Sequence, residues 1–351
     1  MKRISAKAFL LIPFLQAAQA AASRLPSYSA SVDFSWVLSD NVFESVDRTY
    51  SDHAGRMMGH FAAEYRLSPL RLALSAQAGL EGYAQYSAEN RYIHDAGLAA
   101  EIALTRFAGA GTRLSSRCKR LFNSDSGYDS PSLSPFLAVH PFRALSIQVF
   151  GLKGYSDYIS GRFFDYTETG LGIMIRYQPF SILGLTFSMN RDEIRFERDI
   201  WSYVPDSRTF RILDENQKDD IRTWSLQAEL YWHALIRVGY AWQACSSNSY
   251  GYAYSRPQLT LVAAKALPER LTVNFYMRLQ WKTYRDSLSP QWIIHPDSET
   301  EENNFIWLSL SRDLTGAISL KAQTGWYRNE SPFRNRYYSK HFYSLGFSVR
   351  F

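Results

Sequence analysis

The strongest constraint on folding lies in the last ten residues of the 351-residue chain, from Phe342 to Phe351. Side chains alternate between the two faces of a strand. One face of this segment would carry the larger apolar side chains, Tyr343, Leu345, Phe347, Val349 and Phe351. The other face carries small and polar groups, so one side suits lipid and the other suits water. A sheet that faces lipid must pair all its backbone groups between strands, and it therefore has to close into a barrel.

The same alternation recurs inside the chain. Residues 71–81, 223–232 and 271–282 each interleave apolar side chains with polar or small ones. In residues 271–282, for example, Leu271 and every second residue up to Trp281 are apolar. We expect this set to face lipid, where a midplane Arg or Lys costs about 2–4 kcal/mol, and the intervening residues to face the lumen.

Residues 1–22 are typical of a secretory signal peptide. Basic residues precede the apolar run Ala8–Leu15, and small residues follow up to Ala22. We expect cleavage near Ala20 or Ala22, which leaves residues 23–351 as one barrel domain. Beyond Ala22 there is no run of about 18 apolar residues, which excludes an ordinary transmembrane helix.

Short turns and longer polar loops alternate along the chain. The predicted short turns lie at Leu67–Leu70, Arg106–Gly109, His140–Arg143, Gln178–Ser181, Trp232–Leu235, Ala266–Glu269 and Arg312–Gly316. These seven turns and eight longer connections would join about sixteen strands. An even strand number, with short turns on one side and long loops on the other, is typical of bacterial outer-membrane proteins. The predicted fold is all-β, a transmembrane antiparallel up-and-down barrel of about 16 strands.

The longest predicted loop is Arg195–Asp219, which carries aromatic residues of its own. It could fold inward as a constriction, cap the outer mouth, lie in solvent, or form a hairpin that extends the barrel wall.

The chain has two cysteines, Cys118 and Cys245. They fall on strands about six apart, too distant for disulfide geometry, so we expect both to be unpaired.

Composition agrees with this fold. Aromatic residues make up 15% of the chain, as expected where rings form girdles at the membrane interfaces. The mean hydropathy of −0.28 is compatible with barrel strands, because only half of their residues face lipid. The net charge of +6 is not concentrated on one basic face, so nucleic-acid binding is not expected.

Charged residues at lumen-facing positions of the predicted strands are the candidate pore-lining residues. They are Arg71, Glu81, Arg113, Arg117, Lys119, Arg176, Glu229, Arg237, Arg278 and Lys282. Three of the basic residues, Arg113, Arg117 and Lys119, share one face of one strand and could form a ladder for an anionic solute. Alternatively, arginines and acids on neighbouring strands pair across the wall and only fill and stiffen the lumen.

Motifs for catalysis, metal binding or cofactor binding do not occur. The seven histidines are scattered, and the sequence has no Gly-x-Ser-x-Gly, His-Glu-x-x-His, Cys-x-x-Cys, Walker or dinucleotide fingerprint. We therefore expect no enzymatic activity, no metal and no cofactor.

With these features, the chain resembles a bacterial outer-membrane β-barrel protein over essentially its whole mature length. The resemblance implies localisation in the outer membrane of a Gram-negative-type bacterium, with outer-membrane lipid and the barrel assembly machinery as partners. It also implies that Phe351 belongs to the assembly signal, together with Tyr343, Phe347 and Val349. The segment Ser39–Phe43 is similar to a motif in several barrel families, including surface-lipoprotein assembly modifiers. Residues 1–22 show no tetratricopeptide-like pattern, so we expect a departure from the assembly-modifier pattern.

Two functions agree with this sequence. A barrel of about sixteen strands is too wide for side chains alone to fill, which favours a porin-like channel. Small hydrophilic solutes would diffuse past charged groups, with a slight anion preference from the basic excess. The alternative is a non-conducting barrel that acts in surface assembly, export or partner docking through its long external loops.

Overall fold

The computed structural model describes residues 27–42, 49–123, 127–159, 161, 164–207, 209–286, 303–329 and 338–351. The predicted signal peptide, residues 1–22, lies outside the described residues. No helix in the described part of the chain is long and apolar enough to cross a membrane.

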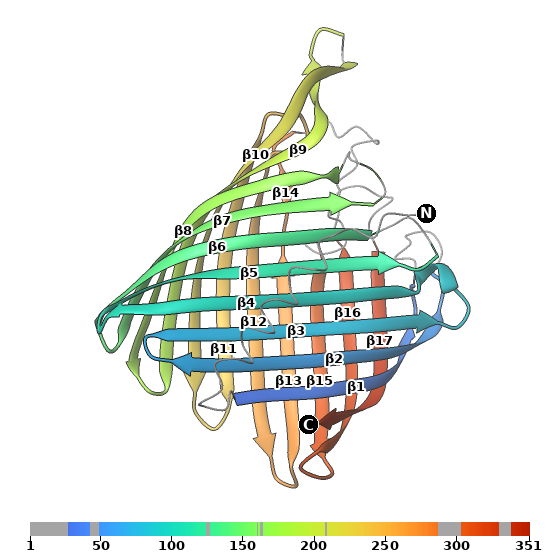
Figure 1. Cartoon of the computed structure of the whole chain (residues 1–351). Helices are drawn as coiled ribbons and strands as arrows, with labels where there is room; N and C mark the ends of the chain where they lie inside the picture. The colour runs from blue at the N-terminus through green and yellow to red at the C-terminus, as the bar shows by residue number, and fades with distance from the viewer. Residues whose placement is uncertain are drawn as a thin grey trace, which may run out of the picture.

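Strands make up nearly all of the described structure (Figure 1). They are β1 (Ser27–Ser39), β2 (Asp52–Leu67), β3 (Leu70–Tyr83), β4 (Arg91–Thr105), β5 (Ala108–Leu121), β6 (Gly127–Phe142), β7 (Leu145–Tyr158), β8 (Tyr166–Phe180), β9 (Leu183–Val204), β10 (Thr209–Tyr231), β11 (Leu235–Ser247), β12 (Tyr254–Leu267), β13 (Leu271–Gln280), β14 (Thr283–Tyr284), β15 (Asn303–Asp313), β16 (Ile318–Asn329) and β17 (Tyr338–Arg350). A short 3-10 helix, η2 (Ser87–Glu89), lies between β3 and β4.

The strands form one closed antiparallel barrel. Apart from β14, each strand pairs with the strands before and after it along the chain, and β1 pairs with both β2 and β17, which closes the sheet. The short strand β14 continues the line of β13, since both pair with β12. If β13 and β14 are counted as one interrupted strand, the described residues form a barrel of sixteen strands. The predicted all-β barrel of about 16 strands is confirmed.

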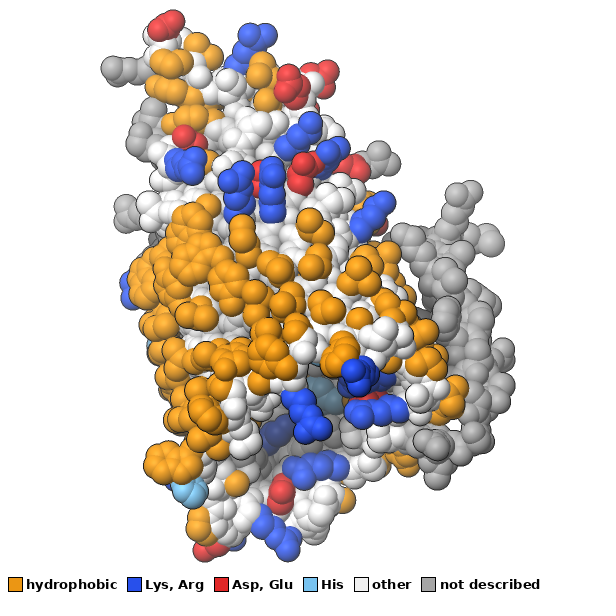
Figure 2. Space-filling model, turned by 90° about the vertical axis from the view of Figure 1, so that its left-hand side faces the viewer, with side chains coloured by type: hydrophobic (Ala, Val, Ile, Leu, Met, Phe, Trp, Pro, Cys, Tyr) orange, Lys and Arg blue, Asp and Glu red, His pale blue; other side chains and the backbone are white. Residues whose placement is uncertain are grey.

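The register defines the two faces of the wall. Opposite residues in an antiparallel pair share a face, and following the pairs from β1 to β17 gives one inner and one outer face. Large apolar side chains on the outer face, such as Trp36, Leu171 and Leu345, are 54%, 65% and 63% exposed. On the side of the barrel that Figure 2 presents, such side chains form a broad hydrophobic belt. This belt is the surface that lipid covers, so the barrel spans a membrane with its strands.

The two ends of the barrel differ. At one end, seven short turns connect successive strands, near the start of β1 and the end of β17. We call this the turn end, and it contains all seven predicted short turns. The opposite end, called the loop end, carries the longer connections. Short turns face the periplasm in outer-membrane barrels, so the loop end is extracellular.

The two cysteines are both free and buried. Cys118 lies on β5 and Cys245 on β11, and the register places Cys118 on the outer face and Cys245 on the inner face. The prediction that they are unpaired is confirmed, since the two thiols lie six strands apart and on opposite faces of the wall.

The seam between β1 and β17 is held on both faces. On the outer face, the rings of Phe34 and Phe347 stack with centroids 5.2 Å apart. On the inner face, Lys321 of β16 reaches across β17 to Asp33 of β1, with 2.7 Å between Nζ and Oδ2. The residue opposite Lys321 on the intervening strand is Gly346, which has no side chain to obstruct this contact.

The predicted assembly-signal residues lie in or beside this seam. Tyr343, Phe347 and Phe351 are exposed, and the register places Tyr343 and Phe347 on the outer face. Val349 is partly exposed and lies opposite Val32 and Ile318. The seam position suits the expected role, but recognition by the assembly machinery stays a prediction.

The close approach at Gly346 makes it a test of barrel closure. A Cβ atom at this position would overlap the backbone of Phe34 and lie 2.8 Å from the Cα of Ser35. We expect Gly346→Val to lower the free energy of unfolding by about 1–3 kcal/mol, the usual cost of overpacking. The measurement is urea-induced unfolding in detergent micelles, with the folded band on an unheated gel as a second readout.

The matched control is Gly55→Val. Gly55 also lies in a strand, but a Cβ there would meet nothing within 4 Å. We expect this variant to unfold at or above the urea concentration of the unchanged protein, since Val favours strands. Equal behaviour of the two variants would contradict a steric requirement for glycine at the seam.

Candidate functional site

The candidate functional site is the inner wall of the barrel, and the structure places all ten predicted pore-lining residues there. Arg71 and Glu81 belong to β3, the three ladder residues to β5, and the rest to β8, β10, β11, β13 and the residues after β13. Lys282 lies beyond the end of β13, with its Nζ 4.2 Å from the ring centroid of the inner-face residue Tyr254. That these side chains line a conducting path stays a prediction.

Several of these charges are neutralised across the wall. Arg71 contacts Glu64 at 2.8 Å and Glu101 at 3.7 Å, and the guanidinium of Arg237 contacts Glu229 at 2.5 Å. These partners lie directly or diagonally opposite on neighbouring strands, where opposite charges stabilise a sheet. For these residues the interpretation that charges stiffen the wall is the better one.

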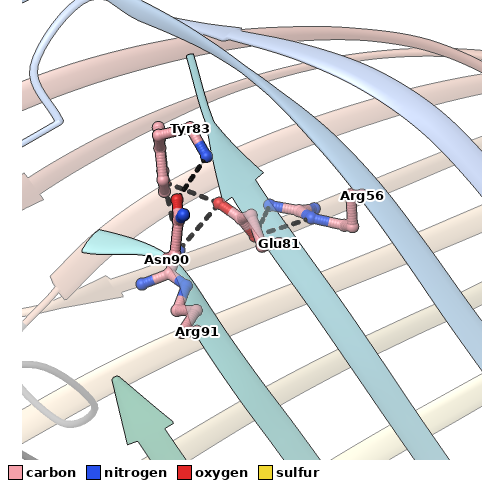
Figure 3. Close-up of polar contacts among 5 residues, drawn as sticks. All are labelled: Arg56, Glu81, Tyr83, Asn90 and Arg91. Atoms are coloured by element: carbon pink, nitrogen blue, oxygen red, sulfur yellow. Dashed lines mark hydrogen bonds and ion pairs between the residues drawn. The ribbon is translucent and has the colours of Figure 1, made fainter. Parts of the chain in front are cut away.

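Glu81 is the centre of the most buried ion-pair cluster among the described inner-face residues (Figure 3). It is only 7% exposed and lies between Arg56 of β2 and Arg91 of β4, at 2.8 and 3.0 Å. The hydroxyl of Tyr83 donates a hydrogen bond to the same carboxylate at 2.6 Å. One carboxylate therefore ties three consecutive strands together near the loop end.

The backbone beside this cluster is fixed as well. The side-chain oxygen of Asn90 accepts a hydrogen bond of 2.6 Å from the backbone N–H of Tyr83 (Figure 3). The carboxylate of Asp52 accepts hydrogen bonds from the backbone of Gln85 and Tyr86, each 3.0 Å long. Together these contacts anchor the connection between β3 and β4 to the barrel rim.

The ladder on β5 divides into paired and unpaired cations. Arg117 contacts Asp95 of β4 at 3.1 Å. Arg113 has no carboxylate contact among the described residues. Its guanidinium lies 4.7 Å from the ring centroid of Phe136, and it donates a 3.4 Å hydrogen bond to Gln148. The structure therefore supports both interpretations of the ladder, each for a different residue.

Arg176 of β8 resembles Arg113 in its surroundings. Its contact within the described chain is with the sulfur of Met174, 3.6 Å from Nη2, and no described carboxylate contacts it. Both guanidinium-bearing side chains are exposed on the inner face. Arg113 lies five residues from the turn-end start of β5, and Arg176 lies four residues from the turn-end limit of β8. Both positive charges therefore lie in the periplasmic half of the lumen.

Other inner-face cations near the loop end lie over aromatic rings. Arg198 lies 4.2 Å from the ring centroid of Phe196 and 4.7 Å from that of Tyr252. Arg278 lies 5.6 Å from the centroid of Phe305, which stacks on Tyr276 at 4.7 Å. These cation–π contacts orient the positive groups against one side of the lumen.

The opposite side of the lumen is lined by small residues. One continuous row across β1 to β7 contains, in register, Ser29, Ala62, Ser75, Gly97, Ser115, Ser132 and Gly154. We call this the small-residue row. A hollow of about 660 Å³ lies against its first five strands, with Glu64, Asp95 and Arg113 among its lining residues. The wall therefore leaves open space beside charged groups.

The predicted loop Arg195–Asp219 is mostly strand, so among the four forms considered for it, the hairpin that extends the wall is the one observed. Strand β9 continues to Val204 and β10 starts at Thr209, and the two project beyond the rim (Figure 1). Irregular pairing interrupts this hairpin between Leu213 and Lys218, which explains the missing alternation in the sequence.

The connection between β11 and β12 braces this hairpin. The backbone N–H of Tyr250 donates to the carbonyl of Trp201 on β9, and the side chain of Asn248 accepts from the N–H of Lys218 on β10, both at 2.7 Å. The ring of Tyr250 also lies 5.3 Å from that of Tyr203 and 5.5 Å from that of Phe210. The projection is therefore a supported element of the extracellular surface.

Sequence reasoning missed several inner-face residues. Arg91 and Asp95 share the parity of Glu101 on β4, and this alternation would have identified them. Arg198 and Gln217 form a buried hydrogen bond of 2.8 Å, but they lie in the segment interpreted as a loop. No group of three or more potential metal-ligating side chains occurs within the described ranges.

The early motif Ser39–Phe43 lies at the loop end of the seam, with Phe43 outside the described residues. Asn41 is fully buried, and its side-chain amide donates a 3.1 Å hydrogen bond to the carbonyl of Ser339. This contact gives the motif a structural role, because it joins the ends of β1 and β17.

Comparisons with known proteins give architecture only. No family model matches the chain, and no curated protein matches it. Among solved structures, a bacterial polysaccharide outer membrane secretin has a TM-score of 0.44 at 7% identity, covering 92% of this chain and 98% of that one. OmpT of Vibrio cholerae has a TM-score of 0.46 at 10% identity, covering 94% and 99%. OccK8 (OprE) of Pseudomonas aeruginosa has a TM-score of 0.43 at 8% identity, covering 93% and 98%. Identities this low relate the chain to these proteins by barrel architecture at most.

The buried position of Glu81 leads to a stability prediction. Removing one partner of a buried ion-pair cluster typically costs about 3–5 kcal/mol. We expect Glu81→Gln to lower the free energy of unfolding by an amount toward the lower end of that range, because the amide retains some hydrogen bonds. The measurement is urea unfolding followed by tryptophan fluorescence in micelles.

The control is Glu269→Gln at the turn end. Glu269 also pairs with an arginine, Arg312 at 3.2 Å, but its side chain is 77% exposed. Exposed ion pairs contribute about 0–1 kcal/mol, so this variant should unfold almost like the unchanged protein. Similar losses in both variants would show that burial does not decide the contribution of Glu81.

Proposed function

We propose that the protein is a passive outer-membrane channel for small hydrophilic solutes, with a slight preference for anions and without catalytic activity. The observation that carries this proposal is the small-residue row. Seven consecutive strands present small side chains along one inner row, from Ser29 to Gly154. A sixteen-stranded barrel is already too wide for side chains to fill, and this row widens it further.

The expected anion preference rests on unequal compensation of charge. Most inner-face arginines contact a carboxylate, whereas Arg113 and Arg176 contact none among the described residues. Both are exposed to the lumen in its periplasmic half. A fixed positive potential in a narrow channel with low-dielectric walls attracts anions more than cations.

Charge reversal in the lumen tests this proposal. We expect the combined change of Arg113, Arg117 and Lys119 to Glu to shift the reversal potential from mild anion selectivity to cation selectivity. Among single variants, Arg113→Glu should have a larger effect than Arg117→Glu, because Asp95 already compensates Arg117. The measurement is the reversal potential of single channels in a planar bilayer under a salt gradient.

The control for the single variants is Arg312→Glu, which reverses one charge on the outer face at the turn end. It should leave selectivity unchanged. Unchanged reversal potential in the triple variant would refute the role of the ladder. A silent bilayer from demonstrably folded protein would refute the channel itself.

The braced hairpin favours a second candidate function, a non-conducting barrel that docks an extracellular partner in surface assembly or export. Exposed residues on the hairpin include Ile212, which is 54% exposed although apolar. The bilayer measurement also separates the two functions, because a docking barrel would fold and insert without conducting. Deleting the hairpin should leave conductance intact if the barrel is a channel.

A further inference from the structure

On the outer face of β9 and β10, apolar side chains give way to arginines from one row to the next. On β9 the outer-face residues Leu185, Phe187 and Met189 are followed by Arg191, and on β10 Leu226 and Trp224 are followed by Arg222. Figure 2 shows basic and acidic side chains directly above the hydrophobic belt on the face that it presents. The apolar surface therefore ends at a charged border on the extracellular side.

Arg191 and Arg222 occupy directly opposite positions on this border. Like charges placed directly opposite destabilise a sheet. Asp220 contacts both guanidinium groups, at 2.5 Å for Arg191 and 3.6 Å for Arg222, so it compensates one of two charges. The two arginine side chains are still 65% and 63% exposed. One carboxylate therefore contacts two exposed guanidinium groups on this border.

More cations surround the arginine pair. Arg195 and Lys218 lie opposite each other two rows closer to the hairpin tip, and Lys153 lies on the outer face of β7 opposite Thr169. We call these five residues, Lys153, Arg191, Arg195, Lys218 and Arg222, the outer cationic patch. The described outer-face acids between them are Glu193 and Asp220, so the patch has a net positive charge.

The height of the patch matches a lipid headgroup. Arg191 is eight residues from the turn-end start of β9 at Leu183. With a rise of about 3.3 Å per residue and a tilt of about 40°, it lies about 20 Å above that end, near the limit of an apolar band about 25 Å tall. One row lower, Trp224 lies 6.1 Å from Trp242 and 5.4 Å from Tyr240, as expected of interfacial aromatics.

We propose that the outer cationic patch binds the phosphate groups of an outer-leaflet lipid. Guanidinium groups bind phosphate oxygens in a bidentate manner, and the unbalanced charge of Arg191 and Arg222 would be neutralised by such a ligand. The hydroxyl-bearing residues Thr167 and Thr169 lie on β8, between the strands of Lys153 and Arg191, and are exposed on the outer face. The acyl chains would lie on Leu171 and Trp224. This site is separate from the lumen and does not depend on conduction.

The test measures lipid binding to the folded full-length protein in detergent. The probe is diphosphorylated lipid A, titrated and counted as bound adducts by native mass spectrometry. We expect the double variant R191Q/R222Q to bind at least about tenfold more weakly than the unchanged protein. The matched control is R312Q, which removes an outer-face, ion-paired arginine of 56% exposure at the turn end and should bind normally.

Two further binding measurements and a replacement variant complete the test. Dephosphorylated lipid A should bind the unchanged protein as weakly as diphosphorylated lipid A binds R191Q/R222Q. Inorganic phosphate at the same concentration should not compete with diphosphorylated lipid A. Equal binding by R191Q/R222Q, equal binding of the dephosphorylated lipid, or full competition by inorganic phosphate would each overturn the proposal. If that double variant does not give the folded gel band, R195Q/K218Q replaces it with the same expectation.

Discussion

Every backbone amide that faces hydrocarbon must form a hydrogen bond with a neighbouring strand. At the seam between β1 and β17, these hydrogen bonds join the two ends of the barrel sequence. The ion pair of Lys321 and Asp33 joins positions 288 residues apart. Contacts of such separation form late, because loop closure costs entropy before the contact stabilises anything. The seam therefore combines ladder hydrogen bonds, a stacked aromatic pair and an ion pair that bridges β17.

The inner wall uses charge in two ways. Near the loop end, Glu81 and its arginine partners lie in the wall and join strands. In the periplasmic half, Arg113 and Arg176 lie on the wall surface and remain exposed. The difference follows from the strand register. Arg56 and Arg91 lie opposite the carboxylate of Glu81, whereas Arg113 and Arg176 lie opposite serines. Ion-paired charges that join strands and exposed charges without a carboxylate partner among the described residues thus lie in different rows of one lumen.

Much of this architecture was predictable from period-two alternation. The strand count, the seven short turns and the inner and outer faces all follow from where apolar residues alternate. The hairpin between Arg195 and Asp219 was not, because irregular pairing near Asn216 breaks the alternation that identifies a strand. Cross-strand pairing of inner-face charges was one of the two interpretations considered, but which residues pair with each other could not be predicted. Whether Arg117 meets Asp95 depends on the register between β4 and β5, which local sequence does not specify.

At the small-residue row, the stability of the barrel wall and the free width of the lumen depend on different parts of the chain. The hydrogen-bonded ladder that holds β1 to β7 together belongs to the backbone, whereas the free width of the lumen at this height depends on side chains such as Ser75 and Ser115. Replacing one of these by a larger residue narrows the passage without removing a ladder bond. If the barrel conducts as proposed, substitutions in this row would change the size limit for solutes without changing the barrel itself.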